Sequence, residues 1–178
     1  MQCGPAGEKL VRVAAIINMA TRAAGRTGMG AVMGAKRQQA VVARGSSKRM
    51  PIAAPKELNI LARQGAKAMP DNSGMCGLRD HGTAGGLASQ NATGGLPTAN
   101  WDTGQFQGFD SISGETMTET ILTDNDTCYA CTVYCKRVVE TEFMGQEIDE
   151  KYGGPEYETL ATFGSYCGMS DLDAPALA

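Results

Sequence analysis

The sequence predicts an α+β fold, with a short β-rich N-terminal piece followed by a mainly α-helical segment with long loops. Two observations carry this prediction. Apolar runs rich in β-branched residues, which favour strands, lie near the N-terminus at residues 8–18 and 40–44. From residue 55 onward, apolar residues recur at helical spacing, and glycine-rich stretches separate the helical patterns.

Residues 22–36, RAAGRTGMGAVMGAK, separate the two predicted strands. Their first half is predicted to be a loop. Their second half has enough alanine, methionine and valine for a short helix over Met29–Lys36. The stretch 45–55, GSSKRMPIAAP, is polar and punctuated by proline, so it predicts a linker between two domains.

The segment 55–69, PKELNILARQGAKAM, places apolar residues at helical spacing behind a proline suited to the first helical position, and it predicts a helix. A glycine-rich middle extends from Pro70 to Gly108 and contains one predicted short helix, Thr83–Gln90. Ser113 is a suitable N-cap for a further helix over residues 113–122.

Three cysteines in CYACTVYC, residues 128–135, lie in a predicted loop after TDNDT. Residues 136–151 predict a strand-like or irregular piece. Two glycines and Pro155 then indicate a helix that runs to about Tyr166. The last residues, 171–178, are compatible with helix.

Composition limits the classes of function. A net charge of −3 with 20% charged residues gives no support for binding nucleic acid or an anionic membrane surface. The first ten residues lack the pattern of a signal peptide, and no apolar stretch approaches the roughly 20 residues that cross a bilayer. We therefore expect a soluble cytoplasmic protein. The 23 glycines suggest a backbone that closely approaches a large bound cofactor.

The glycine-rich loop before Met29 matches neither common phosphate-binding motif. A P-loop requires lysine directly after its second glycine, and here the lysine comes one place too late. The glycines from Gly28 to Gly34 also miss the Rossmann spacing by one residue. Arg22 and Arg26 remain beside a helix N-terminus, which suits a cofactor phosphate group but equally a turn with solvated arginines.

The cysteine pattern is more specific. Cys128, Cys131 and Cys135 form C-x2-C-x3-C, a spacing that lets thiolates converge on one metal centre. Zinc and an iron–sulfur cluster both accept it, and the mostly uncharged residues between the cysteines favour a shielded redox cluster. Cys167 or His81 could supply a fourth ligand within the chain. Three reduced structural cysteines are the simplest alternative.

Glu156 and Glu158 follow Pro155 in the first turn of a predicted helix. Carboxylates there stabilise the helix dipole whatever the function. Chemistry alone therefore assigns them no catalytic role.

Five segments resemble, in the same order, the aldehyde:ferredoxin oxidoreductase family of tungsten enzymes with a bis-pterin cofactor. They are GPAGEKLVRVAAIIN, RAAGRTGMGAVMGAKRQQAVVARG, GLPTANWDTGQF, CYACTVYCKR and YGGPEYETLATFGSYCGMSDL. The resemblance covers nearly the whole chain and implies an internal fragment of a longer protein. Residues 1–47 would end the pterin-binding β domain, and residues 48–178 would open an α-helical middle domain that carries the iron–sulfur cysteines.

The resemblance also implies a cofactor loop. Its RAAGR motif is similar to a loop that grips a pterin phosphate and its magnesium-linked partner, so the implied cofactor-binding residues are Arg22, Ala23, Gly25 and Arg26. Thr27 departs from the family pattern, because it interrupts a run of glycines after the second arginine. Cys3 is a further departure, at a position where an apolar residue is usual.

Cys128, Cys131 and Cys135 resemble three of the four thiolates that hold a [4Fe-4S] cluster in the family, with the fourth expected beyond residue 178. Glu158 resembles an active-site carboxylate near the tungsten, suited to moving protons.

The implied reaction is oxidation of an aldehyde to a carboxylic acid at tungsten or molybdenum, with electrons passing through the cluster to ferredoxin in the cytoplasm of an anaerobe. The oligomeric state stays open, a homo-oligomer of the full-length protein included. A different class of function stays open beside it: a small zinc-stabilised interaction module that uses Cys128, Cys131, Cys135 and Cys167.

Overall fold

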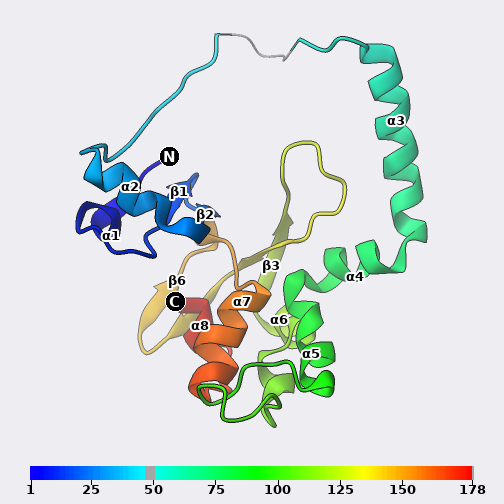
Figure 1. Cartoon of the computed structure of the whole chain (residues 1–178). Helices are drawn as coiled ribbons and strands as arrows, with labels where there is room; N and C mark the ends of the chain where they lie inside the picture. Colours follow the sequence, from blue (N-terminus) through cyan, green and yellow to red (C-terminus); the bar gives the residue numbers. More distant parts are fainter. Residues whose placement is uncertain (47–50, 178) are drawn as a thin grey trace. The chain divides into compact units, whose positions relative to one another are not determined.

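The computed structural model describes residues 1–46 and 51–177, and the chain divides into two compact units, Met1–Ala53 and Ala54–Ala178 (Figure 1). Helices and short antiparallel strands are both present, which confirms the predicted α+β class. The predicted domain boundary between residues 47 and 48 lies outside the described residues. Among the helices described, none is both long and apolar enough to cross a membrane.

The described part of the first unit contains two helices, one 3₁₀ turn and one hairpin. Their bounds are α1 (Gly4–Glu8), β1 (Ile16–Asn18), β2 (Arg22–Ala24), η1 (Arg26–Gly28) and α2 (Met29–Ala35). Strands β1 and β2 pair antiparallel, with Ile16 opposite Ala24. The predicted short helix from Met29 is confirmed and ends one residue early, at Ala35.

Three predictions for this unit were wrong. The strand expected over residues 8–18 is limited to Ile16–Asn18. Helix α1, with Pro5 in its first turn, extends to Glu8, and Leu10 adopts a left-handed φ of 57° that interrupts any strand. Residues 40–44 form no strand, and only Ala40 makes an isolated bridge to Gln2. The first half of residues 22–36 is not all loop, since β2 pairs with β1 there.

Helices α1 and α2 pack backbone against backbone through glycines. A methyl group placed on Gly34 of α2 would lie 1.9 Å from the Gly7 carbonyl oxygen of α1. A methyl group on Gly7 would lie 2.6 Å from the Gly30 oxygen. These glycines are therefore required by the close approach of the two helices. Cys3, just before α1, is buried and donates from Sγ to the Gln38 carbonyl (3.4 Å), so it fills an apolar position as a small hydrophobic residue.

The second unit contains six helices, two hairpins and several tighter turns among its described residues. The helices are α3 (Pro55–Ala68), α4 (Ser73–His81), α5 (Leu87–Thr93), α6 (Gly114–Thr120), α7 (Tyr157–Thr159) and α8 (Asp173–Leu177). The strands are β3 (Leu122–Asp126), β4 (Lys136–Val139), β5 (Thr141–Phe143) and β6 (Gln146–Ile148). The turns are η2 (Met69–Asp71), η3 (Thr83–Gly86), η4 (Phe109–Ile112), η5 (Glu150–Tyr152), η6 (Leu160–Gly164) and η7 (Ser165–Cys167).

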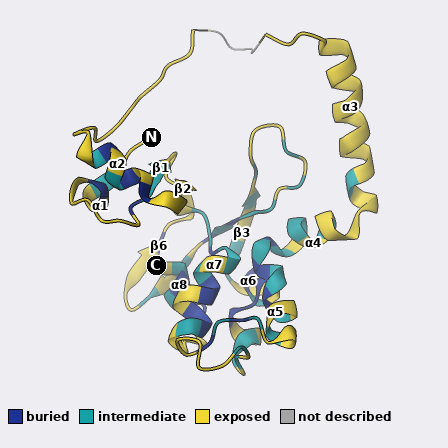
Figure 2. Cartoon of the chain, in the orientation of Figure 1, coloured by how far each residue is buried: buried dark blue, intermediate teal, exposed yellow. Residues whose placement is uncertain are grey.

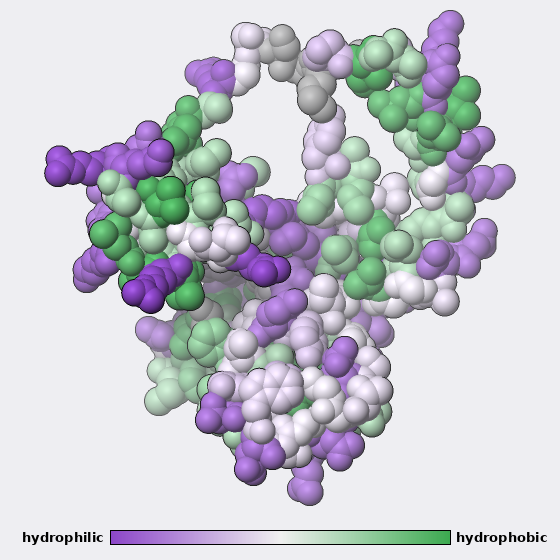
Figure 3. All heavy atoms as spheres, in the orientation of Figure 1, coloured by the Kyte–Doolittle hydropathy of each residue, from purple (hydrophilic) through white to green (hydrophobic). Residues whose placement is uncertain are grey.

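One apolar core holds this unit together, in and around helices α5, α6 and α7 (Figure 2). Its fully buried members include Leu87, Leu96, Ile112, Met117 and Leu160. Burying such side chains contributes about 1.5–3 kcal/mol each. Helix α3 lies outside this core: it has no buried residue, and its apolar side chains are exposed at the surface (Figures 2 and 3).

The helix predictions for this unit have a mixed outcome. Helix α3 is confirmed within one residue, and α6 is confirmed with Ser113 as its N-cap, accepting a hydrogen bond from the Thr116 amide at 3.1 Å. The helix expected over Thr83–Gln90 begins as the 3₁₀ turn η3 and continues as α5. Helix α4 was not predicted, although Asn72 caps it by accepting from the Met75 amide.

The helical stretch expected after Pro155 is present but changes geometry along its length. Helix α7 continues into a π-helical turn, η6, and then into the 3₁₀ turn η7. Ser165 at the start of η7 is buried, and its hydroxyl donates to the Pro97 carbonyl at 2.7 Å. The Ala99 amide donates in return to the Ser165 carbonyl at 3.0 Å, so this end of the stretch is fixed to the segment around residue 98.

Candidate functional site

The three cysteines lie in the loop that joins β3 to β4. These strands pair antiparallel with Asp126 opposite Lys136, so residues 127–135 form the connecting loop, as the sequence predicted (Figure 1). The Cys131 amide donates to the Cys128 carbonyl at 3.0 Å and closes a tight turn between these two cysteines. The Thr127 hydroxyl donates to the Cys131 carbonyl at 2.9 Å and holds the same turn from outside.

All three loop cysteines are free thiols. Cys128 is exposed, whereas Cys131 and Cys135 are half-buried. Within the described ranges, no group of three or more histidine, cysteine, aspartate or glutamate side chains is placed to hold a metal ion. The structure therefore places the cysteines on one loop without bringing their sulfurs into a ligand set. What fits an iron–sulfur cluster is the chemistry of the donors, three thiols in a short loop.

Arg137, two residues after Cys135, fixes the base of this loop to helix α4. Its side chain is 4% exposed, and its two terminal nitrogens donate to three backbone carbonyls. The acceptors are Asp80 (2.9 Å) and Arg79 (2.7 Å) at the end of α4, and Tyr134 (2.9 Å) in the loop. Sequence reasoning missed Arg137, although its alternation with the buried Val139 places both on the inward face of β4.

Burial lowers the pKa of the Arg137 guanidinium, and the nearby charges of Cys135 and Glu156 oppose that shift. The Nε atom of Arg137 is buried without a hydrogen-bond partner. Gly82, directly after α4, has a φ of +63°, and a methyl group there would lie 2.9 Å from the Cys135 carbonyl oxygen. Only glycine at this position lets the base of the loop lie so close to the helix end.

The arginine–glycine loop lies in the first unit, on β2 and η1. Arg22 is half-buried, and its Nη1 donates to the Thr21 hydroxyl at 2.8 Å. Ala23, Gly25 and Arg26 are exposed. Gly25 has an ordinary φ of −81°, and a methyl group on it would meet no atom within 4 Å. Neither packing within this unit nor backbone conformation requires glycine there.

Thr27 adopts a left-handed backbone with φ 71° and ψ 2°. This conformation is rare for a β-branched residue and costs roughly 1–2 kcal/mol. The loop thus keeps at Thr27 a conformation that glycine would adopt without strain.

Two glutamates at the start of α7 differ in their surroundings. Glu156 accepts a hydrogen bond from the Thr83 hydroxyl at 2.8 Å, and its other oxygen lies 3.7 Å from Lys136 Nζ. Thr83 also accepts from the Tyr157 amide at 2.9 Å, which fixes the first turn of α7 to η3. Glu158 is exposed. Burial of the Tyr157 side chain raises the pKa of its phenol, and the negative charge of Glu158 adds to that shift. Glu156 is therefore held structurally, whereas Glu158 is accessible.

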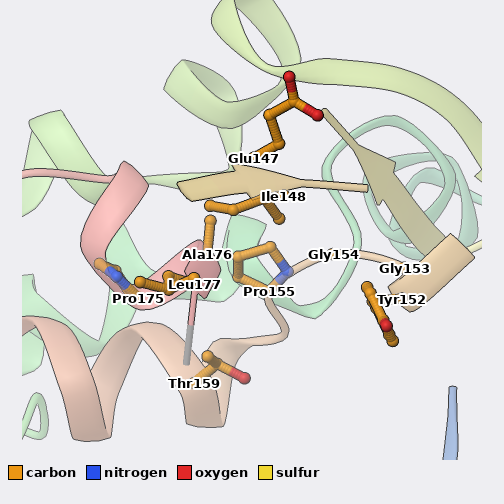
Figure 4. Close-up of a pocket in the computed structure, with 10 residues that line it drawn as sticks. All are labelled: Glu147, Ile148, Tyr152, Gly153, Gly154, Pro155, Thr159, Pro175, Ala176 and Leu177. Atoms are coloured by element: carbon orange, nitrogen blue, oxygen red, sulfur yellow. The ribbon is translucent and has the colours of Figure 1, made fainter. Parts of the chain in front are cut away.

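A surface pocket of about 410 Å³ lies beside the start of α7 (Figure 4). Its lining includes Ile148, Tyr152, Pro155, Thr159 and Pro175. None of the cysteines lines it, and neither does Glu158. The pocket is thus separate from the side chains that the sequence singled out.

Cys167 and His81 do not join the loop cysteines. Cys167 lies in η7, and its thiol donates to the Thr162 carbonyl at 3.2 Å. His81 ends α4, and its Nδ1 lies 3.2 Å from the Thr118 hydroxyl, a packing contact between α4 and α6. Neither side chain adds a fourth ligand to a set within the described residues.

Comparison with known proteins gives matches over both units. Residues 1–45 match the family model "Aldehyde ferredoxin oxidoreductase, N-terminal domain", and residues 60–178 match "Aldehyde ferredoxin oxidoreductase, domains 2 & 3". The tungsten-containing aldehyde ferredoxin oxidoreductases of Thermococcus kodakarensis and Pyrococcus furiosus are 42% and 39% identical to this chain over 170 residues. A protein of Pyrococcus furiosus named "Aliphatic sulfonate oxidoreductase, WOR-like subunit" is 30% identical over 172 residues.

The matched segments cover 95% of this chain but only 27% of the two tungsten-containing relatives, and 93% of this chain but 26% of the third protein. The chain therefore spans about a quarter of the length of these relatives. The second family model alone covers more than half of the chain, and the first accounts for most of the remainder. On this evidence, the chain belongs to the aldehyde ferredoxin oxidoreductase family.

Proposed function

We propose that this chain acts as part of a longer tungsten- or molybdenum-pterin enzyme that oxidises aldehydes to carboxylic acids. The observation that carries the proposal is a loop with three free thiols in a chain whose two units both match the family. In this proposal residues 1–47 end the pterin-binding β domain, and residues 48–178 begin the α-helical middle domain. The reaction converts an aldehyde and water into a carboxylic acid, two protons and two electrons.

The arginine–glycine loop binds the pterin cofactor in this proposal. Arg22 and Arg26 supply guanidinium groups for a phosphate, with magnesium as its counter-ion. The exposed backbone of Ala23 and Gly25 leaves room for close approach of a ligand, since the space around Gly25 is open. The fit therefore rests on the open space at Gly25 and on the charge of the two arginines.

Cys128, Cys131 and Cys135 are proposed to hold three irons of a [4Fe-4S] cluster, with the fourth thiolate supplied from outside this chain. When bound, the cluster supplies one-electron transfer, and ferredoxin in the cytoplasm is the proposed acceptor. The role of the protein is to present the thiols on a loop whose base is fixed to α4 by Arg137.

Glu158 is proposed to accept and release the protons of the reaction. The carboxylate is exposed and lies in the first turn of α7, whose start is fixed by the Thr83 contacts. A general acid or base needs a mobile proton and a defined position, and Glu158 combines accessibility with an anchored backbone.

The test is Cys128→Ser in the complete polypeptide, purified without oxygen. We expect loss of both iron and aldehyde oxidation, because a missing thiolate opens the cluster to solvent. Cys167→Ser is the matched control, since Cys167 lies outside the loop, and it should keep both. Full iron content and activity in Cys128→Ser would refute the cluster assignment.

The zinc-module alternative is not favoured. Cys167 bonds to the backbone of its own helical stretch, and both units match an oxidoreductase family. Metal analysis of the parental protein separates the two functions, because a zinc module contains stoichiometric zinc and no iron.

A further inference from the structure

Arg137 stands out among the charged side chains of the second unit because it is almost completely buried. Arginine is rarely buried to this extent unless it is paired, since removing a charge from water is costly. Its hydrogen-bond acceptors are backbone carbonyls, those of Arg79, Asp80 and Tyr134. The guanidinium therefore joins two backbone segments that lie more than fifty residues apart in the sequence.

One of these segments is the C-terminal end of helix α4. The last carbonyls of a helix lack partners within it and carry the negative end of the helix dipole. The buried Arg137 guanidinium gives two of these carbonyls hydrogen-bond donors, and its positive charge is favourable at the negative end of the dipole. Helix α4 thus gives the guanidinium a site of matching charge and fixed geometry.

The other segment is the end of the cysteine loop. Tyr134 precedes Cys135 and adopts a left-handed φ of 57°, so the chain turns sharply where Arg137 holds its carbonyl. The Cys135 carbonyl lies against Gly82, at a distance that any other residue there would disturb. Two independent contacts therefore fix the backbone on either side of the third cysteine.

We propose that Arg137 is a positioning residue for the cysteine loop, which anchors Cys135 to the end of α4 and supplies a buried positive charge beside the cluster. The inference rests on the proposed cluster site and assigns to it a residue outside the ligand pattern. Arg137 thus has two separable roles. Its hydrogen bonds position Cys135 and should affect how firmly iron is held, which is the positioning claim. Its positive charge should affect the reduction potential of the cluster, which is the charge claim.

The experiment compares Arg137→Gln and Arg137→Lys in the complete polypeptide, with Arg79→Gln as the matched control. The Arg79 side chain lies at the same helix end but is 40% exposed, and it forms an ion pair with Asp80. Folding of each variant is checked by circular dichroism. Iron release to a chelator and the midpoint potential of the cluster, from an electron paramagnetic resonance titration, are then measured.

We expect Arg137→Gln to release iron about 10- to 100-fold faster than the parental protein, the range typical of lost outer-shell partners. Its midpoint potential should become more negative, because reduction adds negative charge to a site that has lost a positive one. Arg137→Lys should restore the potential toward the parental value but release iron faster, since an ammonium group cannot span the three carbonyls as a planar fork does. Arg79→Gln should match the parental protein in both.

Parental iron release in Arg137→Lys and in a folded Arg137→Gln would overturn the positioning claim. If Arg137→Gln does not fold, iron release from Arg137→Lys alone tests the positioning claim, because lysine keeps the positive charge but lacks the planar guanidinium that spans the carbonyls. An unchanged potential in a folded Arg137→Gln would overturn the charge claim. These outcomes differ from failure of the proposed function, in which the parental protein holds no iron and Cys128→Ser changes nothing.

Discussion

Substituting Gly34 by alanine tests the close packing of α1 on α2. The new methyl group would lie 1.9 Å from the Gly7 carbonyl oxygen and 2.5 Å from its carbon, whereas ordinary contact begins at 3.4 Å. The two backbones would have to separate by about 1.5 Å, the difference between 3.4 and 1.9 Å. Neither contact atom belongs to a side chain that could rotate away.

The expected cost combines two effects. Overpacking of this kind costs typically about 1–3 kcal/mol, and the rigid backbone contact places Gly34→Ala at or above the upper end. Replacing glycine by alanine inside a helix returns about 1 kcal/mol. We therefore expect a net loss of about 2 kcal/mol in the local stability of the first unit.

The matched control is Gly25→Ala, in the same unit. Its backbone is in an ordinary region, and the methyl group would enter open space, so we expect no loss and a gain of up to about 1 kcal/mol. Because Gly25 belongs to the proposed cofactor loop, the same variant should retain less pterin after dialysis. The two glycines thus separate a packing role from a binding role.

The assay is hydrogen exchange of the complete polypeptide, read by mass spectrometry on peptides from residues 1–45. A loss of 2 kcal/mol corresponds to exchange about 20- to 40-fold faster in Gly34→Ala. Exchange at the parental rate would show that α1 and α2 do not approach each other as described. Parental pterin content in Gly25→Ala would leave the loop with no demonstrated binding role.

Three further substitutions test the second unit and the strained loop. Glu158→Gln should lower turnover by about 100-fold, as for a lost general acid or base, without changing hydrogen exchange in α7. Turnover that is unchanged at every pH would show that Glu158 only stabilises the helix dipole. Thr83→Val should cost about 2 kcal/mol, because Glu156 and the Tyr157 amide both lose their hydroxyl partner; protection of that amide at the parental level would contradict this. Thr27→Gly should stabilise the first unit by roughly 0.5–1 kcal/mol, because relief of the left-handed backbone strain exceeds the entropy cost of glycine. A lower stability of the variant in urea denaturation would show that the backbone at Thr27 is not strained.

Elements with strong local signals were predictable from the sequence. Helices α3 and α6 begin at a proline and at a serine cap, and their signals lie within each segment. Helix α4 was missed for the opposite reason. It contains Gly74 and Gly77, each costing about 1 kcal/mol in a helix, and its end is satisfied by Arg137 from far along the chain. Tertiary contacts of this kind leave no local pattern.

Residues 40–44 show the reverse error. Their valines have high strand propensity, yet Val42 is 90% exposed, and only Ala40 finds a bridging partner among the described residues. A strand requires a neighbour as well as propensity.

The candidate site was predictable where its residues are close in sequence. The spacing of Cys128, Cys131 and Cys135 shows that they share a loop, and the structure places them on one. The support of Arg137 for that loop was not predictable, because its acceptors at Arg79 and Asp80 are distant. The abundance of glycine was interpreted as room for a cofactor. Gly7 and Gly34, however, allow the close approach of α1 and α2, and Gly30 allows α2 to lie against the backbone of Ala14 and Ala15.

The π-helical turn between α7 and η7 lets this stretch hold one more residue than an α-helix of the same length. Deleting a single residue such as Thr162 would therefore allow a continuous α-helix. The residues after the deletion would keep their positions around the helix axis, because the π turn already absorbs the extra residue. Ser165 would keep its hydrogen bond to Pro97 and its paired backbone contact with Ala99. Sequences of this family that are one residue shorter here should therefore need no change in the segment around residues 97–100.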